Sequence, residues 1–518
     1  MTALKAPELL LPAGSLDKMR AAYDFGADAI YAGQPRYSLR ARNNEFRLEQ
    51  IEIGIREAHA RGKKFFVTSN LLPHNDKVRT YMRDIAPVIA LKPDALIMAD
   101  PGLIMMVREQ YPEVPIHLSV QANTVNYAAV RFWQRMGVAR IILSRELSLD
   151  EIEKIRQECP DMELEVFVHG ALCIAYSGRC LLSGYFNRRD PNQGTCTNAC
   201  RWNYAAQETA TDPNTGEAIP VKMEQGFNFN QAQEEAESSF AACGGGERHP
   251  KADQVYLIEE AGRPGQLMPI MEDEHGTYIM NSKDLRAIEP VQRLAESAFA
   301  ATSTCGGGSR HPLADRVYLL EEKERPGQLM PIMEDEHGTY IMNSKDLRAV
   351  EHVARLAKIG VDSLKIEGRT KSLYYVARTA QVYRRAIDDA VAGRPFNPEL
   401  LLELEGLANR GYTGGLLERR PSQDYQNYIT GHSVAHRSQF VGEVRSVRED
   451  GWAEVETKNR FAVGDTLEVI HPSGNRRVRL ERMTSLEGAP VEVAPGSPVR
   501  VWVPLEGPSE GALIARML

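Results

Sequence analysis

Short runs of aliphatic and β-branched residues recur along this chain, and they alternate with amphipathic stretches of helical period. This alternation is typical of βα units, in which helices connect parallel strands. Eight units of this kind favour an α/β fold of the (β/α)8 TIM-barrel type, and a doubly wound open sheet is the alternative. The predicted strands are residues 8–14, 28–33, 64–70, 94–100, 116–121, 140–147, 164–170 and 362–368, with helices expected at 15–27, 48–62, 126–137 and 149–158.

Polar residues close most of these apolar runs. In a (β/α)8 barrel the active site is built at the C-terminal ends of the strands, so these residues are candidates for a site at the barrel mouth. Helix capping and loop hydrogen bonding are the ordinary explanations for any single one of them. Their joint placement is the stronger indication. The candidates are Asn70, Asp100, Gln121, Ser144, Arg145, Glu146, His169, Lys365, Glu367 and Arg369.

Four cysteines, Cys173, Cys180, Cys196 and Cys200, fall in one short stretch directly after the seventh predicted strand. Clustered thiolates are typical of zinc and iron–sulfur sites. Structural zinc usually takes cysteines two to four residues apart, a spacing that Cys196 and Cys200 have and the other two lack. The spacing therefore favours a 4Fe-4S cluster over zinc, and four buried thiols without a metal are the remaining alternative.

Charge and hydropathy limit the partners and the compartment. Lys and Arg total 62 against 70 for Asp and Glu, a formal charge of −8, so any binding to nucleic acid must be local. No stretch approaches the roughly 20 apolar residues of a membrane span, and the N-terminus lacks a signal-peptide pattern. We therefore expect a cytoplasmic protein without a membrane partner, in which clustered cysteines indicate metal binding or catalysis rather than disulfides.

A duplication interrupts the βα pattern. Residues 263–287 recur without change at 325–349, an offset of 62 residues (325 − 263). Two copies are too few for a repeat architecture. Only one copy can fill a single place in the barrel. We predict that it is the second, because a helix expected at 344–360 leads directly into the last strand, and that the first packs peripherally.

The remaining composition changes divide the chain further. Residues 205–238 are polar and rich in turn-forming residues, which predicts a loop or linker. After residue 439, short alternating strands separated by turns indicate a small all-β domain. The predicted divisions are 1–204, the first seven βα units; 205–324, the linker and first copy; 325–395, the second copy, last strand and helix; 396–438, a helical connector; and 439–518, a C-terminal β-barrel.

The residues around the cysteines resemble a known family. ELEVFVHGALCIAYSGRCLLS is similar to the signature of the collagenase-like peptidases, family thirty-two among peptidases of unassigned mechanism, and LKIEGRTKSLYYVARTAQVYRRAID resembles that family's other conserved block. The resemblance covers nearly the whole chain except the extra repeat copy and the linker before it. It implies a 4Fe-4S cluster held by the four cysteines. It also implies prephenate-dependent hydroxylation of the wobble uridine of tRNA to 5-hydroxyuridine, the first step towards 5-carboxymethoxyuridine.

The resemblance and the chemistry of prephenate assign candidate roles. Prephenate carries two carboxylates, which arginine binds in a bidentate manner, so Arg145 and Arg369, with Lys365, are the expected anchors. An electron donor is a possible further partner. Arg36, Arg40 and Arg42 are expected to contact tRNA phosphates, with Tyr37 available for stacking, although an arginine-rich surface loop explains them equally well. The candidate catalytic residues are His169, Glu146, Lys365 and Glu367, and Asn70 and Gln121 are further substrate-binding candidates.

Two other classes of function stay open. A peptidase would need a nucleophile and base, such as Cys173 beside His169, but no third orienting residue and no HExxH motif is evident in the sequence. A non-catalytic RNA-binding accessory protein would bind tRNA without turning it over.

Overall fold

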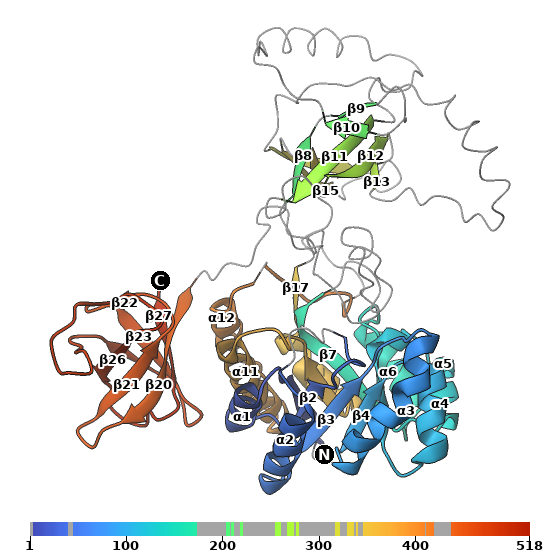
Figure 1. Cartoon of the computed structure of the whole chain (residues 1–518), viewed down its shortest axis with the longest axis horizontal. Helices are drawn as coiled ribbons and strands as arrows, with labels where there is room; N and C mark the ends of the chain where they lie inside the picture. The colour runs from blue at the N-terminus through green and yellow to red at the C-terminus, as the bar shows by residue number, and fades with distance from the viewer. Residues whose placement is uncertain are drawn as a thin grey trace. The chain divides into compact units, whose positions relative to one another are not determined.

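Eight parallel strands form the closed barrel expected from the sequence. The computed structural model describes residues 4–39, 45–172, 345–409, 411–418 and 437–518, together with the backbone of strands between residues 204 and 339. It divides into two units, Met1–Ala199 with Ser344–Leu518, and Cys200–Asn343. Strand β18 pairs with both β1 and β7 and closes the barrel. Figure 1 labels β2, β3, β4 and β7 of this barrel. The strands are β1 (Glu8–Pro12), β2 (Ala29–Gly33), β3 (Lys64–Ser69), β4 (Ala95–Met98), β5 (Ile116–Leu118), β6 (Arg140–Ile142), β7 (Glu163–Ala171) and β18 (Ser363–Ile366).

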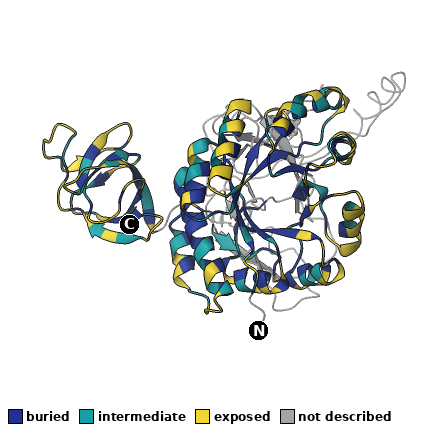
Figure 2. Cartoon of the chain, turned by 90° about the horizontal axis from the view of Figure 1, so that it is seen from below, coloured by how far each residue is buried: buried dark blue, intermediate teal, exposed yellow. Residues whose placement is uncertain are grey.

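Helices surround this barrel, and their inner faces bury the outward side chains of the strands in one apolar core (Figure 2). Several begin at a capping side chain: Ser148 and Glu151 form a capping box, and Ser372 accepts a hydrogen bond from the Tyr375 amide. In the described part of the chain no helix is long and apolar enough to cross a membrane. The helices are α1 (Leu16–Asp24), α2 (Leu48–Ala60), α3 (Asn75–Ala90), α4 (Pro101–Gln110), α5 (Tyr127–Arg135), α6 (Leu149–Glu158), α10 (Val353–Ile359) and α11 (Leu373–Val391).

The segment before the last barrel strand differs from its prediction. We expected one helix over 344–360, but the chain forms strand β17 (Asp346–Arg348), and helix α10 begins only at Val353. Strand β7 pairs with β6 only up to Glu165, so its C-terminal end offers unpaired backbone groups. Strand β17 satisfies them by antiparallel pairing, and β19 (Tyr412–Thr413) pairs with β17 in turn.

Both copies of the repeat form strands in the second unit. In the first copy Gln254 lies opposite Glu272, and in the second Arg316 lies opposite Glu334, so the two hairpins share one register. The hairpin of the second copy falls within the unit Cys200–Asn343, and the C-terminal end of that copy forms β17, which pairs with β7 of the barrel. The strands are β11 (Gln254–Glu260), β12 (Leu267–Asp273) and β13 (Gly276–Tyr278), and β14 (Arg316–Glu321), β15 (Leu329–Asp335) and β16 (Gly338–Thr339).

The segment that was expected to be a linker also contains strands. β8 joins the sheet of the first hairpin, and β9 pairs with β10. A sequence without clear period has thus formed short antiparallel ladders, because pairing partners supply the hydrogen bonds that its own pattern does not indicate. These strands are β8 (Tyr204–Gln207), β9 (Thr209–Thr211) and β10 (Ala218–Pro220).

The C-terminal residues form the all-β domain that their alternation predicts. Its six-stranded antiparallel sheet has the order β24-β23-β27-β20-β21-β26, and a two-stranded sheet pairs β22 with β25. The inward side chains make a separate apolar core. The strands are β20 (Ser438–Val447), β21 (Trp452–Thr457), β22 (Phe461–Ala462), β23 (Thr466–Ile470), β24 (Arg476–Arg479), β25 (Val493–Ala494), β26 (Arg500–Pro504) and β27 (Leu513–Met517).

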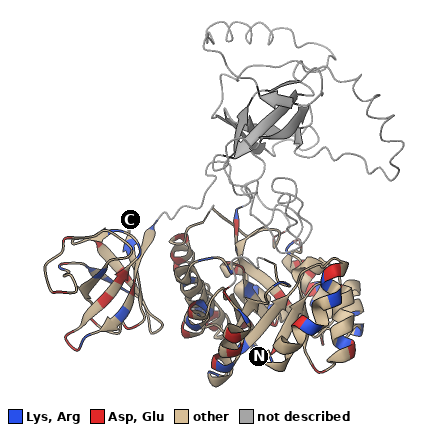
Figure 3. Cartoon of the chain, in the orientation of Figure 1, with Lys and Arg blue, Asp and Glu red and all other residues tan. Residues whose placement is uncertain are grey.

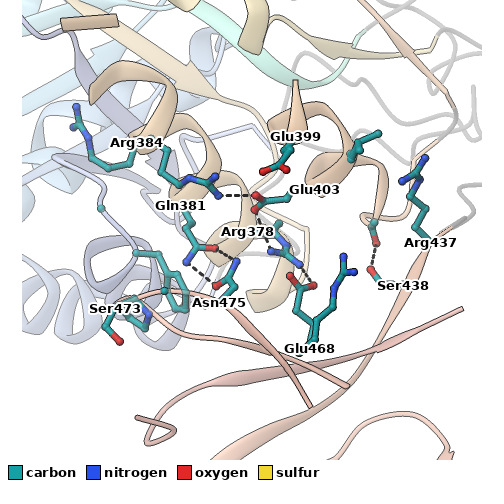
Figure 4. A pocket seen from close by; sticks show the side chains of 18 of the residues that line it. Arg378, Gln381, Arg384, Glu399, Glu403, Arg437, Ser438, Glu468, Ser473 and Asn475 are labelled. Atoms are coloured by element: carbon teal, nitrogen blue, oxygen red, sulfur yellow. Dashed lines mark hydrogen bonds and ion pairs between the residues drawn. The ribbon is translucent and has the colours of Figure 1, made fainter. Parts of the chain in front are cut away.

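This domain contacts the barrel through helix α11 and the short helix α12 (Glu399–Glu405). Phe440 stacks on Tyr374 at 5.0 Å between ring centroids. The buried Arg378 bridges the two parts by pairing with Glu403 of α12 at 3.3 Å and with Glu468 of β23. A cleft of about 880 Å³ lies beside these contacts (Figure 4).

The cleft is polar, but its charges are largely paired. Arg384 binds Asp28 and Asp388, and Arg385 binds Glu403. Carboxylates therefore already occupy these guanidinium groups, and the cleft is a gap beside the contact between the barrel and the C-terminal domain.

Candidate functional site

The interior of the barrel is charged. Alternate residues of each strand face inward, and the register pairs Lys365 with Phe167 and Arg140 with Glu163. Four inward side chains, Glu8, Arg140, Glu165 and Lys365, form what we call the inner charge cluster. Because barrel interiors are usually filled by branched apolar residues, this cluster is an unusual core.

Glu165 is the centre of the inner charge cluster and is fully buried. Its carboxylate accepts hydrogen bonds from Lys365 Nζ at 2.7 Å and from Arg140 Nη1 at 3.1 Å, and Arg140 also binds Glu8 at 2.6 Å. Burial lowers the pKa of Lys365, although Glu165 opposes this shift. Burial would raise the pKa of Glu8, but Arg140 and Lys64 hold it below its ordinary value.

Lys365 lies inside the barrel, one residue before the end of β18. Its ammonium group is 4.4 Å from the centroid of the Tyr31 ring and forms a buried ion pair with Glu165. It is also 5.4 Å from the centroid of the Phe167 ring, over which Arg145 lies at 4.0 Å.

Polar side chains from β3 and β5 meet at the mouth. Asn70 Nδ2 donates to Ser119 Oγ at 3.2 Å and to Gln121 Oε1 at 3.1 Å, while its Oδ1 accepts from the Leu39 amide at 3.2 Å. Ser119 also donates to Gln121. The predicted candidates Asn70 and Gln121 are thus brought together, and Asn70 is buried.

The loops after β6 and β18 add charged groups to this mouth. Arg369 donates to Thr68 Oγ1 at 3.0 Å and to the Leu39 carbonyl. Ser144 donates to the Glu146 carboxylate. These two hydrogen bonds connect the loop after β18 to Thr68 of β3 and to Leu39, which follows β2.

Arg145 is held rigidly at the same end of the barrel. It donates to the Ala171 carbonyl at 2.9 Å and to Glu367 at 3.2 Å, and its guanidinium carbon lies 4.0 Å from the centroid of Phe167. Its buried Nε has no hydrogen-bond partner within the described residues. Gly170 permits this packing, because a Cβ there would lie 2.6 Å from the Glu367 carbonyl oxygen.

His169 faces away from the mouth. Its ring lies 5.4 to 5.8 Å from the rings of Tyr375, Tyr383 and Tyr412, and it is almost completely buried. Burial lowers the pKa of His169 to about 3, although Asp346 opposes this shift, so the imidazole is neutral near pH 7. Its expected position among the mouth residues is wrong, because the side chain packs on the outer face of β7.

This burial predicts acid sensitivity of the fold. The pKa of His169 is depressed from 6.5 to about 3 on folding, so the unfolded chain binds the proton first as the pH falls. The free energy of unfolding should be highest above pH 6.5 and fall by about 1.4 kcal/mol per pH unit below it. Denaturant unfolding of wild type and His169→Phe between pH 7 and about 4 measures this. A variant with the same pH slope as wild type would contradict the prediction.

The predicted tRNA-contacting loop is only partly described. Arg36 pairs with Asp84 at 2.8 Å. Tyr37 is completely buried and bonds to Thr80 at 2.7 Å, so the expectation that its ring is available for stacking is wrong. Arg40 and Arg42 lie outside the described residues.

The predicted cysteine site also lies outside the described residues. Cys173, Cys180, Cys196 and Cys200 all follow Leu172, where the description of the barrel ends. Elsewhere, the described parts of the chain contain no group of three or more His, Cys, Asp or Glu residues that could hold a metal ion. The cysteine segment begins two residues after Ala171, whose carbonyl Arg145 holds.

Sequence reasoning missed the inner charge cluster. Its signal was available, because Glu163 and Glu165 alternate with apolar residues inside a strand that is otherwise buried. It also missed the three tyrosines around His169, which come from α11 and β19 and have no local sequence relation to β7.

Comparison with known proteins identifies close relatives. Residues 14–303 and 312–427 match Peptidase family U32, and residues 436–516 match the Peptidase family U32 C-terminal domain. The tRNA hydroxylation protein P of Escherichia coli is 52% identical over 96% of this chain and 94% of its own length. Its Haemophilus influenzae namesake is 50% identical over 96% and 92%. A 23S rRNA 5-hydroxycytidine synthase of Escherichia coli is 37% identical over 39% of this chain and 30% of its own length.

Proposed function

Because this chain belongs to peptidase family U32, and its near full-length relatives are tRNA hydroxylation proteins, we propose that it is an enzyme that hydroxylates tRNA. The substrate atom is C5 of the wobble uridine. The product is 5-hydroxyuridine, the first intermediate of 5-carboxymethoxyuridine synthesis. The sequence identity of 50% and 52% to these relatives, over 96% of this chain, carries the proposal. A relative that forms 5-hydroxycytidine in ribosomal RNA supports the same chemistry at a pyrimidine ring.

The proposed cofactor is a 4Fe-4S cluster held by Cys173, Cys180, Cys196 and Cys200. Four thiols within 28 residues (200 − 173 + 1) are a donor set that fits such a cluster. When bound, it would supply electron transfer to the hydroxylation. The hydrogen bond from Arg145 to the Ala171 carbonyl supports a position of the cluster near the barrel mouth. Ala171 lies two residues before Cys173, the first of the four cysteines.

The proposed co-substrate is prephenate, and the mouth residues suit a dicarboxylate. Among the described residues Arg145 Nε has no hydrogen-bond partner, and Arg369 donates to Thr68 Oγ1 at the same end of the barrel. Guanidinium groups bind carboxylates through paired hydrogen bonds, so these two residues would hold and orient prephenate. Glu146 and Glu367 are the neighbouring carboxylates that could accept or return a proton.

Loss of a cysteine should abolish the modification. The protein is purified without air, its visible spectrum and its iron and sulfide content are recorded, and tRNA from a deletion strain is assayed for 5-hydroxyuridine with and without prephenate. Wild type should be coloured and active, whereas Cys173→Ala should lose the iron–sulfur absorption and at least about 100-fold of the activity. Cys159→Ala is the matched control, because Cys159 is a buried thiol that follows α6.

Four outcomes would contradict this proposal. A colourless zinc protein, or a Cys173→Ala variant that restores 5-hydroxyuridine as well as wild type, would exclude the iron–sulfur assignment. Binding of tRNA without turnover would indicate an accessory protein. Cleavage of gelatin that chelation abolishes would indicate a peptidase.

A further inference from the structure

Two of the chain's four tryptophans lie on the outer face of the C-terminal sheet. In β21 the side chains of Ala453 and Val455 are buried in the domain core, so Trp452 and Glu454 point outward. Strand β26 pairs with β21, and Trp502 lies opposite Glu454. The two indoles are therefore diagonal neighbours on one sheet face, a separation within reach of aromatic side chains.

An arginine covers each of these rings. The guanidinium carbon of Arg448 lies 3.8 Å from the centroid of Trp502, and that of Arg482 lies 5.2 Å from the centroid of Trp452. We call these four residues the Trp/Arg patch. Such cation–π contacts hold the planar guanidinium group over the ring while its N–H donors remain directed to the sides.

The other arginines on this face of the sheet have their charge neutralised by ion pairs. Arg445 binds Glu456 at 2.7 Å, and Arg500 binds Glu454 at 3.0 Å. Neither Arg448 nor Arg482 has an ion pair with any residue that the structure describes in this domain. Basic and acidic residues are otherwise mixed over the barrel and the C-terminal domain, without a broad positive field (Figure 3).

We propose that the Trp/Arg patch binds the phosphate backbone of the tRNA substrate. This inference rests on the proposed function, and it adds a binding surface in the C-terminal domain. The two N–H groups of a guanidinium fork match two phosphate oxygens. Because each side chain is already held against an indole ring, it loses less conformational entropy when the phosphate contact forms. In a chain with a net charge of −8, RNA must be held by local cations that carboxylates have not already occupied, and Arg448 and Arg482 meet that requirement.

The tryptophans act through the arginines that lie over them. Each indole fixes the plane of its guanidinium group, so the two cations are already oriented when a phosphate approaches. The patch therefore offers phosphate pairing, a contact that holds RNA without reading its sequence.

Removing both patch arginines should weaken tRNA binding. The dissociation constant of unmodified tRNA is measured by fluorescence anisotropy at several salt concentrations, using the full-length chain. Arg448→Ala/Arg482→Ala should bind about 10- to 100-fold more weakly, and the slope of log K against log salt should fall by about two, because two phosphate contacts are lost. Trp502→Leu, which keeps both charges, should bind several-fold more weakly.

The matched control is Arg445→Ala/Glu456→Ala, which removes an arginine of the same face together with the carboxylate that it pairs with. Its affinity should stay within about twofold of wild type, since the net charge of the face does not change. An equal loss in both double variants, or no loss in the patch variant, would overturn the proposal. Competition by polyglutamate as effective as that by tRNA would instead assign the patch to an acidic protein.

The proposed function is judged separately. If wild type binds no tRNA and forms no 5-hydroxyuridine, the function itself fails. If wild type does both and the patch variant binds tRNA equally well, only the patch assignment fails. At saturating tRNA the patch variant should still form 5-hydroxyuridine, because its residues lie in the C-terminal domain and not at the barrel mouth.

Discussion

Glu165→Leu is expected to lower the free energy of unfolding by about 3 to 5 kcal/mol. Glu165 is the carboxylate that pairs with Lys365 and also binds Arg140 inside the barrel, where water cannot replace it. Leucine fills a similar volume but leaves the ammonium group without its ion-pair partner. Urea unfolding of the full-length chain, followed by circular dichroism, measures the loss.

A double variant separates charge from packing. In Glu165→Leu/Lys365→Met both members of the pair become apolar, so most of the lost stability should return. Asp24→Ala is the exposed control, because Asp24 pairs with Arg61 at the surface and its loss should cost no more than about 1 kcal/mol. A single variant as stable as the control, or a double variant no better than the single, would show that the inner charge cluster is not what stabilises this core.

The barrel could be predicted because each of its strands carries its own signal. A buried parallel strand requires a short apolar run whatever surrounds it, and helices on the outside require an apolar stripe. The eight runs therefore indicated the strand order and the closed sheet. The ends of the strands were harder to predict. The run at 140–147 forms a strand only over Arg140–Ile142, and the rest of the run, which includes Arg145, forms a loop at the barrel mouth.

The direction of individual side chains could not be predicted in the same way. Glu165 and Phe167 point inward, and simple alternation would turn His169 inward as well. The register instead shifts between Lys365 and Ile366, so that His169 lies opposite Ile366 and turns towards α11. This irregularity depends on pairing between strands nearly 200 residues apart, and no local pattern encodes it.

Long-range partners explain the other differences. Tyr37 looks like part of an exposed binding loop in sequence, but its side chain is buried against α3, where its hydroxyl bonds to Thr80. The neighbouring Arg36 stays exposed and pairs with Asp84 of α3. Strand β17 forms because β7 extends beyond its pairing with β6. That extension depends on how the strands pair in the folded chain, which the local sequence does not indicate. The mouth residues Asn70 and Gln121 were predicted because strand ends in a barrel converge by geometry alone.

Arg145→Ala is expected to reduce kcat/KM for the proposed co-substrate prephenate by about 100- to 1000-fold. Its guanidinium group is oriented by Ala171, Glu367 and Phe167, so a carboxylate meets a donor that is already in place. Arg145→Lys should recover only part of the activity, since an ammonium group cannot reproduce the planar fork. Steady-state 5-hydroxyuridine formation at varied prephenate and saturating tRNA measures this.

A structural role of Arg145 would give a different result. Loss of the Ala171 contact alone would lower kcat at every prephenate concentration, whereas loss of a carboxylate anchor must raise the KM for prephenate and leave the KM for tRNA unchanged. Arg131→Ala is the matched control, because Arg131 lies on the outer helix α5, pairs with Glu158 and should leave both constants unchanged. An Arg145→Ala variant with an unchanged KM for prephenate would remove this residue from the co-substrate site and leave Arg369 as its remaining candidate anchor.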